Sequence, residues 1–305
     1  MRSTSSTSEL NGLANIDVRA GDGFEAVAGE SFDLVVANPP FVISPDSTFT
    51  FRDAQAVGDA LSRDVVRSAA GVLTDGGFAT VLVNWVVREG QDPADPPKTW
   101  LDDLPCDSLI LHNDTLDPVR YAEQWLMESR ATAPAAHRRG VERWLRYDER
   151  IGATAIGSGA VILHRSGRGA RIRVEKMAAI PSEGGEQLER IFGAFGRFSG
   201  PEDDRLLESV PSLVGPHRLE QHLGFHDAHY EAHPATLRLE RSAGIVAHVP
   251  AELLEALFLI DGTRSVGTII DTLADARGEA SSDLRARALP VLIELYELGF
   301  LTLDP

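Results

Sequence analysis

The chain has 305 residues, of which 43 % are hydrophobic, and this is enough apolar material for one large core or two ordinary ones. With 29 basic and 46 acidic residues its formal net charge is −17, which argues against a general nucleic-acid-binding protein. The polar start predicts no signal peptide, no apolar run reaches membrane-spanning length, and the one cysteine, Cys106, cannot form an internal disulfide, so we expect a cytoplasmic protein. The excess of arginine over lysine amid abundant alanine predicts a bacterial source, and the oligomeric state stays open.

Two short elements and a turn open the chain. Leu10–Asn15 reads as the end of a helix, and Ile16–Ala20 alternates as a short strand. Asp22, Gly23 and Phe24 then form part of a glycine-rich turn. On this pattern alone, Asp22 is equally well an ordinary loop carboxylate.

The run Phe32–Ala37 is apolar and β-branched, as is typical of a strand at the centre of a parallel sheet covered on both faces. It ends at Asn38, Pro39, Pro40 and Phe41, because proline cannot donate to a strand ladder. The carboxyl end of such a strand is where open α/β sheets bind ligands. The two prolines hold Asn38 extended and direct its amide at one point, and Phe41 is placed to stack on a planar substrate. The alternative is an ordinary Pro-Pro turn after a strand.

Methyl transfer to nitrogen needs the hydrogen-bond acceptors that such a turn provides. A planar amide or exocyclic amine keeps its lone pair in conjugation, so it attacks a methyl sulfonium only when acceptors take its N–H bonds. The Asn38 side-chain oxygen and the backbone carbonyls of Ala37–Pro39 are suitable acceptors. Alignment of nucleophile, methyl and leaving sulfur supplies most of the remaining catalysis.

The order helix, strand, Gly-Asp, strand, Asn-Pro-Pro-Phe resembles the small-domain branch of class I S-adenosylmethionine-dependent methyltransferases over roughly residues 9–165. That branch includes glutamine methyltransferases and rRNA and tRNA base N-methyltransferases. The resemblance implies a Rossmann-like α/β fold and S-adenosylmethionine as cofactor. By that likeness Asp22 accepts a hydrogen bond from the adenine amine, Phe24 lies near the adenine beyond Gly23, and Asn38 orients the target nitrogen. The methyl acceptor is then a protein glutamine or a base of RNA or DNA.

The chain departs from this family before the glycine-rich turn. Such enzymes carry a first strand with a glycine-rich loop for the methionine part of the cofactor and a second strand with an acid for the ribose. Residues 1–9 are polar and too short for both, and Gly76–Gly77 and Gly157–Gly159 stand in the wrong place. We therefore expect an incomplete sheet without its first two strands, truncated at its amino terminus and weak or inactive. A non-catalytic methyltransferase-like binding protein is the alternative.

This incomplete sheet would leave strand edges bare. Ile16–Ala20 is then expected either to dock on Phe32–Asn38 in a shortened sheet or to be poorly ordered.

The rest of the first domain, predicted to span 1–166, continues with alternating elements. A helix from Asp59 carries a face that reads as core, formed by Leu61, Val65, Ala69 and Val72. Asn84-Trp85 either lines the pocket or anchors packing, and Gln91–Pro97 is either a lid or a connection. The expected elements are a helix stopping at Thr74–Gly77, strands Phe78–Val83, Ser108–His112 and Ala155–His164, and helices near Thr99–Leu104, Asp117–Leu126 and Ala135–Glu149.

The composition shift at Arg165–Gly169 predicts a second, α+β domain over 167–305. Three amphipathic helices and a terminal strand over 245–303 look like a winged-helix module. Few basic residues occur there, which favours packing or protein interaction over binding to a nucleic-acid duplex.

Five histidines crowd one stretch of this domain. Their spacings of three to five residues, with Asp227 and Glu231 nearby, are compatible with metal ligands. The flanking residues alternate as strand, however, so alternate histidines are expected to point to opposite faces, and no metal site is predicted. The five are His217, His222, His226, His229 and His233.

Overall fold

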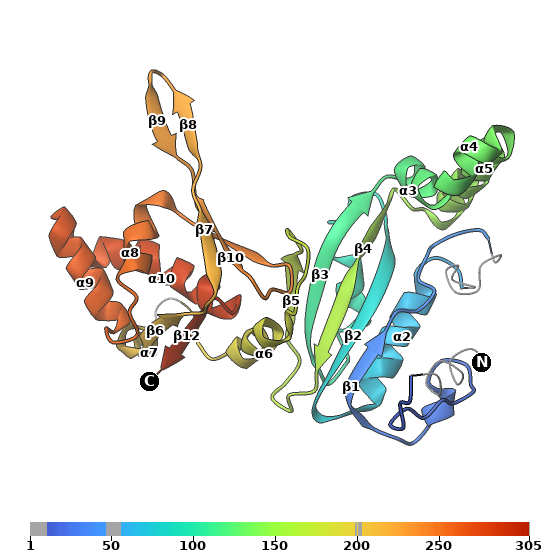
Figure 1. Cartoon of the computed structure of the whole chain (residues 1–305), viewed down its shortest axis with the longest axis horizontal. Coiled ribbons are helices and arrows are strands. Elements are labelled where there is room, and N and C mark those ends of the chain that lie inside the picture. Colours follow the sequence, from blue (N-terminus) through green and yellow to red (C-terminus); the bar gives the residue numbers. More distant parts are fainter. Residues whose placement is uncertain (1–10, 47–55, 199, 201–202, 305) are drawn as a thin grey trace. The chain divides into compact units, whose positions relative to one another are not determined.

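The computed structural model describes residues 11–46, 56–198, 200 and 203–304 (Figure 1). The chain divides into two compact units, Met1–Val174 and Glu175–Pro305. The boundary falls inside strand β5 (Ile172–Lys176), later than the boundary after residue 166 that composition predicts. The difference arises because β5 joins the sheet of the first unit, so the glycine-rich turn before it is not a linker.

A five-stranded mixed sheet in the order β1-β2-β4-β3-β5 forms the centre of the first unit (Figure 1). β1 pairs in parallel with β2, and β4 runs antiparallel to both β2 and β3. The predicted strands within this sheet are confirmed, although β2 already begins at Leu73 and so includes the glycines expected to stop the preceding helix. The bounds are β1 (Phe32–Ala37), β2 (Leu73–Val87), β3 (Asp107–Leu116) and β4 (Ala155–His164).

β1 is an edge strand in the described part of the chain, where it is hydrogen-bonded to β2 alone. Its side chains Leu34 and Val36 are 64 % and 73 % exposed. The described residues thus show the bare strand edge that an incomplete sheet predicts, whereas the cover on both faces that the apolar composition suggested is wrong for them. Apolar composition identified the strand correctly, but composition does not place a neighbour on its outer side.

Residues 16–20 form no regular element and do not pair with β1, so the predicted strand and its docking on Phe32–Asn38, one of the two expected outcomes, are wrong. Ile16 is exposed, so the segment buries no apolar face that would stabilise a strand. Arg19 instead forms ion pairs with Asp17 and Glu30. The helix end expected at Leu10 lies partly outside the described residues, and Asn11-Gly12 form a turn.

One face of the sheet packs against α2 (Ala60–Gly71), which follows the predicted helix closely. Odd-numbered residues of β2 point towards α2 and the 3-10 helix η2 (Pro96–Trp100), the counterpart of the helix expected near Thr99. Trp85 is among them, and its Nε1 donates to the Pro93 carbonyl at 2.7 Å. Trp85 is thus a packing anchor, and the Gln91–Pro97 loop is held as a connection.

Helices α3, α4 and α5 gather at one end of the sheet (Figure 1). The Asp117 side chain caps α3 by accepting from the Arg120 amide at 3.0 Å, and proline follows at the first helical position, as predicted. The helix over α4 has no counterpart in the sequence prediction. The bounds are α3 (Pro118–Trp125), α4 (Met127–Thr132) and α5 (Pro134–Ile151).

The second unit combines small sheets with helices. The three predicted carboxyl-terminal helices form, but β12 pairs with β6, which lies outside residues 245–303. The terminal strand therefore belongs to the unit as a whole rather than to a separate module. Its helices are α6 (Gly185–Ala194), α7 (Asp204–Glu208), η3 (Ala251–Leu253), α8 (Leu254–Phe258), α9 (Val266–Arg277) and α10 (Ser281–Glu297). Its strands are β6 (Val210–Leu213), β7 (His217–Glu220), β8 (Leu223–His226), β9 (His229–Ala232), β10 (Ala235–Leu239), β11 (Val246–Val249) and β12 (Leu301–Asp304).

Four of the clustered histidines lie on or beside the β8–β9 hairpin. His226 pairs with His229, and the His233 amide donates to the His222 carbonyl at 2.9 Å. Opposed residues share a face, so these four side chains lie on one face and the expectation of opposite faces is wrong for them. Across the described residues no group of three or more His, Cys, Asp or Glu side chains is close enough to hold a metal ion.

Within the described ranges no helix is both long and apolar enough to cross a membrane.

Asp148 on α5 is a buried carboxyl group, 2 % exposed. Its Oδ2 makes no hydrogen bond with any described residue. Burial raises the pKa of Asp148 to about 7. The folded protein therefore favours the protonated form of Asp148. The stability that this carboxyl group contributes is fully present at pH values below the ordinary pKa of an aspartate, and it is lost as the pH rises towards 7.

We expect Asp148→Asn to become more stable than wild type as the pH rises from 5 to 8, by up to about 4 kcal/mol for a shift of about three pH units. Thermal unfolding followed by tryptophan fluorescence measures this, because all four tryptophans lie in the first unit. Glu149→Gln, on the exposed neighbour, is the matched control and should track wild type. A difference between Asp148→Asn and wild type that is constant with pH would contradict the prediction.

Candidate functional site

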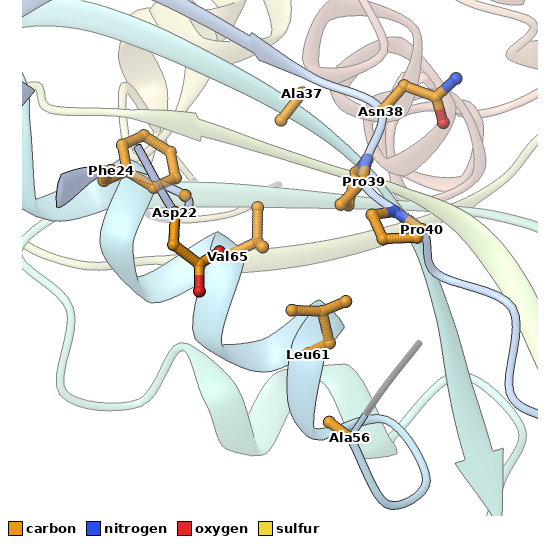
Figure 2. Close-up of a pocket in the computed structure, with 10 residues that line it drawn as sticks. Asp22, Phe24, Ala37, Asn38, Pro39, Pro40, Ala56, Leu61 and Val65 are labelled. Atoms are coloured by element: carbon orange, nitrogen blue, oxygen red, sulfur yellow. The ribbon is translucent and has the colours of Figure 1, made fainter. Parts of the chain in front are cut away.

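The turn Gly21–Phe24 leads into the 3-10 helix η1 (Glu25–Val27). The Asp22 carbonyl accepts from the Glu25 amide at 3.1 Å, which closes the turn. A Cβ on Gly21 would lie 2.7 Å from the Cβ of Ala26, so the turn needs a glycine there. This local geometry places the Asp22 carboxylate and the Phe24 ring on the same side of a pocket (Figure 2).

β1 ends at Ala37, and the chain turns through Asn38, Pro39 and Pro40. The Phe41 amide donates to the Pro39 carbonyl at 2.8 Å, so this carbonyl keeps one lone pair for a further donor. Asn38 is exposed, and its amide forms no hydrogen bond with the residues described. Figure 2 shows the Asn38 amide at the rim of the pocket, pointing away from α2.

The two turns line one pocket of about 720 Å³. This volume lies within the roughly 300–1,000 Å³ that small-molecule sites occupy. The predicted site residues that line it are Asp22, Gly23, Phe24, Asn38, Pro39 and Pro40. The remaining lining residues are apolar, namely Ala37, Ala56, Leu61 and Val65.

The structure separates some predicted residues from this pocket and adds others. Phe41 does not line it but packs with the cluster on α3 and α5, on which it is partly buried. Leu61 and Val65 were expected to be core only, yet they are half-buried and line the pocket. Asn84 and Trp85 are buried elsewhere in the sheet because β2 continues past them to Val87.

A buried tyrosine holds the chain just beyond the Asn-Pro-Pro turn. The Tyr121 hydroxyl accepts from the Ile43 amide at 3.0 Å and from Asn84 Nδ2 at 2.8 Å. Burial raises the pKa of Tyr121, so the hydroxyl stays neutral. Sequence reasoning missed this role, although a polar asparagine inside an apolar strand is a signal that a buried partner exists.

Further contacts hold the chain after the Asn-Pro-Pro turn and at the start of α2. Asp46 accepts from Arg143 at 2.7 Å and from Trp144 Nε1 at 2.9 Å. At the start of α2, Asp59 Oδ2 accepts from the Val86 amide at 3.1 Å. These contacts tie Asp46 to α5 and Asp59 to β2.

The lining fits one end of a nucleoside cofactor. Asp22 is an acceptor suited to an aromatic amine, and Phe24, Leu61 and Val65 supply apolar surface for a flat ring. Among the described lining residues Asp22 is the sole carboxylate, and none is cationic. Such a lining could accommodate a flat ring that carries an amine, and the described lining residues offer no second carboxylate and no cationic group.

Comparison with known proteins relates the amino-terminal segment to methyltransferases. Residues 1–89 match the family model of the methyltransferase small domain. A release factor glutamine methyltransferase of Xylella fastidiosa (strain 9a5c) is 33 % identical over 85 residues, which is 25 % of this chain. The matched segment spans 31 % of that protein's length. These matches support the S-adenosylmethionine-dependent methyltransferase family for the amino-terminal segment, whose members generally use that cofactor.

A solved structure also shows a distant similarity. The crystal structure of a protein provisionally named sarcosine dimethylglycine methyltransferase, from Galdieria sulphuraria, is 19 % identical with a TM-score of 0.31. The similarity covers 54 % of this chain and 66 % of that chain. A TM-score of 0.31 is too low to carry an argument about fold or function.

We expect Tyr121→Phe to destabilise the first unit by about 1–3 kcal/mol, because it leaves the buried Ile43 amide and Asn84 amide without their acceptor. Urea unfolding followed by tryptophan fluorescence measures the change. Tyr230→Phe, on the exposed β8–β9 hairpin, is the control and should leave the midpoint unchanged. An unchanged midpoint for Tyr121→Phe would show that the hydroxyl does not hold this segment.

Proposed function

We propose that the first unit is an S-adenosylmethionine-dependent methyltransferase domain that acts on a planar NH2 group. The observation that carries the proposal is the pocket shared by Asp22–Phe24 and Asn38–Pro40 at the carboxyl end of a parallel strand. The family match over residues 1–89 covers both turns. A strand followed by an unrelated Pro-Pro turn would give no reason for the two turns to meet in a pocket of cofactor size.

Each turn has its own role in this proposal. Asp22 accepts from the adenine amine, Gly23 lets the backbone turn, and Phe24 contacts the ring. The side-chain oxygen of Asn38 accepts a hydrogen bond from the NH2 group that is to be methylated, and the two prolines hold the Asn38 backbone extended. Because the Asn38 amide has no partner among the described residues, it can rotate from the rim towards a bound substrate without breaking a described contact.

The methyl acceptor in this proposal is a glutamine side chain of a protein. The named relative methylates a release-factor glutamine, and a primary amide presents the flat NH2 group that the Asn-Pro-Pro turn suits. An exocyclic amine of an RNA or DNA base has the same planar geometry and is the second acceptor class. The net charge of −17 disfavours extended nucleic-acid binding but not capture of one base.

We further propose that this chain binds the cofactor weakly and transfers methyl slowly or not at all. The described pocket lining offers hydrogen-bonding and apolar groups for the adenine but none for the ribose and the methionine. Most polar groups of the cofactor would therefore have no partner there. A non-catalytic binding role is the alternative function, favoured by the same incomplete lining.

For residues 245–303 we propose a winged-helix-like arrangement, completed by β6 from outside this range, that serves packing or protein interaction. Its arginines are already paired with acids, which leaves little positive charge for phosphates. The pairs are Arg264–Asp261, Arg277–Glu255, Arg285–Asp271 and Arg287–Glu279.

Adenosine and S-adenosylhomocysteine should bind this chain with affinities within about threefold of each other, because only the adenosine end finds partners. At about 0.3 kcal/mol for each of roughly 19 non-hydrogen atoms, adenosine is expected near a Kd of about 0.1 mM. Isothermal titration calorimetry measures both. Asp22→Ala should abolish binding, whereas the matched control Glu25→Ala, on an exposed residue outside the pocket, should not.

Two results would contradict this account of the pocket. Binding of S-adenosylhomocysteine in the low micromolar range would mean that the methionine end is held. Binding of adenosine that survives Asp22→Ala would remove the role assigned to that carboxylate.

Asn38→Ala should lower methyl transfer about 100-fold or more while leaving adenosine affinity within about twofold, since Asn38 contacts the acceptor and not the cofactor. Transfer of labelled methyl to glutamine peptides, and in parallel to RNA and DNA, is the measurement. Glu25→Ala is again the control. Undiminished transfer in Asn38→Ala would refute the role of the asparagine, and absence of transfer from wild type at millimolar cofactor would favour the non-catalytic alternative.

A further inference from the structure

The outer edge of β1 leads directly into the Asn-Pro-Pro turn. Among the described residues β1 pairs with β2 alone, so it borders the five-stranded sheet (Figure 1). The Phe32 amide donates to the Val72 carbonyl at 2.8 Å, which shows that the backbone groups of Phe32 face the β2 side. Alternate residues of a parallel strand bond to opposite sides, so the backbone groups of Asp33, Val35 and Ala37 face outwards.

The same strand presents apolar side chains on the face of the sheet opposite α2. Leu34 and Val36 are 64 % and 73 % exposed, whereas Val35 and Ala37 pack against the cluster that includes α2. Leu82 of β2 continues this exposed strip, because it lies two residues beyond the partner of Val36. A strand added at the outer edge extends the strip, so its own apolar residues find partners at every second position.

The chain around this edge is acidic. Residues 11–37 contain five acids and one base, Arg19, which gives them a net charge of −4. Arg19 already pairs with two of the acids. All five acids are exposed, namely Asp17, Asp22, Glu25, Glu30 and Asp33. This charge attracts a basic partner and repels both a nucleic-acid backbone and the same acidic edge of a second copy.

We propose that the edge of β1 binds the acceptor protein as an extended, basic segment that adds a strand to the sheet. The inference rests on the proposed function and specifies how the glutamine is presented. Main-chain hydrogen bonds to the outward-facing residues hold the segment, and its alternate apolar side chains cover Leu34 and Val36. Ala37 is the last residue of β1, so a glutamine at the end of the paired segment lies beside Asn38.

Fluorescence anisotropy with the full chain tests this edge. The probe is a labelled peptide of alternating valine and lysine that matches the six residues of β1 and carries a glutamine at each end. We expect saturable binding with a Kd below about 1 mM. Two N-methylated versions, one for each alternate set of residues, keep every side chain. The version that loses the donors facing β1 should bind at least about tenfold more weakly, and the other should bind as the parent peptide does.

Two variants of the protein test the exposed strip. Leu34→Lys and Val36→Lys add a positive charge at the edge and should each weaken binding of the basic peptide at least about fivefold. Val119→Lys, on an exposed valine of α3, is the matched control and should bind as wild type does. Circular dichroism checks the fold of each variant, and the pair of N-methylated peptides tests the edge without any change to the protein.

Several outcomes would overturn the proposal. Equal binding of the two N-methylated versions would mean that the peptide main chain is not paired, and wild-type affinity in both lysine variants would place the peptide elsewhere. Absence of binding at about 1 mM peptide would also refute it. An RNA or DNA oligonucleotide that binds more tightly than the peptide would favour a base as acceptor and likewise overturn it.

Adenosine calorimetry separates this inference from the proposed function. Adenosine affinity should stay within about twofold of wild type in Leu34→Lys, because the strip lies outside the pocket lining. Adenosine binding without peptide binding would therefore refute the edge inference alone. Peptide binding without adenosine binding or methyl transfer would refute the proposed function alone.

Discussion

The parallel ladder between β1 and β2 is the constraint on which the pocket depends. In the described part of the chain β1 has this one partner, with Val35 opposite Ala79 and Ala37 opposite Val81. The ladder sets where the strand ends, and two prolines then prevent it from continuing. The position of Asn38 at the carboxyl end of a parallel strand therefore follows from backbone pairing, not from contacts of its own side chain.

Buried and partly buried hydrogen bonds fix the chain on either side of the turn that follows β1. The Tyr121 hydroxyl and the Asp46 and Asp59 carboxylates accept hydrogen bonds that hold the chain on either side of the pocket. A buried amide without an acceptor costs about 1–3 kcal/mol, so these contacts are worth more than their number suggests. They also explain why Phe41 leaves the pocket, since the residues after Pro40 are drawn into the apolar cluster with α3 and α5.

The two units divide the chemistry of the chain. The first holds a mainly apolar pocket with a single carboxylate, which suits a flat ring with an amine. The second pairs most of its arginines with acids and displays histidines on a projecting hairpin. An acidic protein with paired arginines attracts polyanions poorly.

The sequence by itself determined the identity of most elements and of the two turns. Phe32–Ala37, the α2 helix and the Asp117 cap are local signals, because apolar periodicity, proline and capping act over a few residues. The meeting of Asp22 with Asn38 was anticipated from family resemblance, and the pocket brings them together. Local pattern also failed where partners matter, as at Ile16–Ala20, which finds no strand to pair with.

Only the tertiary structure decided which side chains share a surface. The exposed edge of β1, the lining by Leu61 and Val65, the acceptor role of Tyr121 and the common face of His226 and His233 depend on residues distant in sequence or on strand register. When a strand slips by one residue in its pairing, all of its side chains move to the opposite face of the sheet. A hydrogen bond between residues 78 positions apart leaves no periodic pattern in the sequence. Composition and spacing indicate which secondary structure a segment prefers, whereas the segments that pack against it determine which residues its side chains contact.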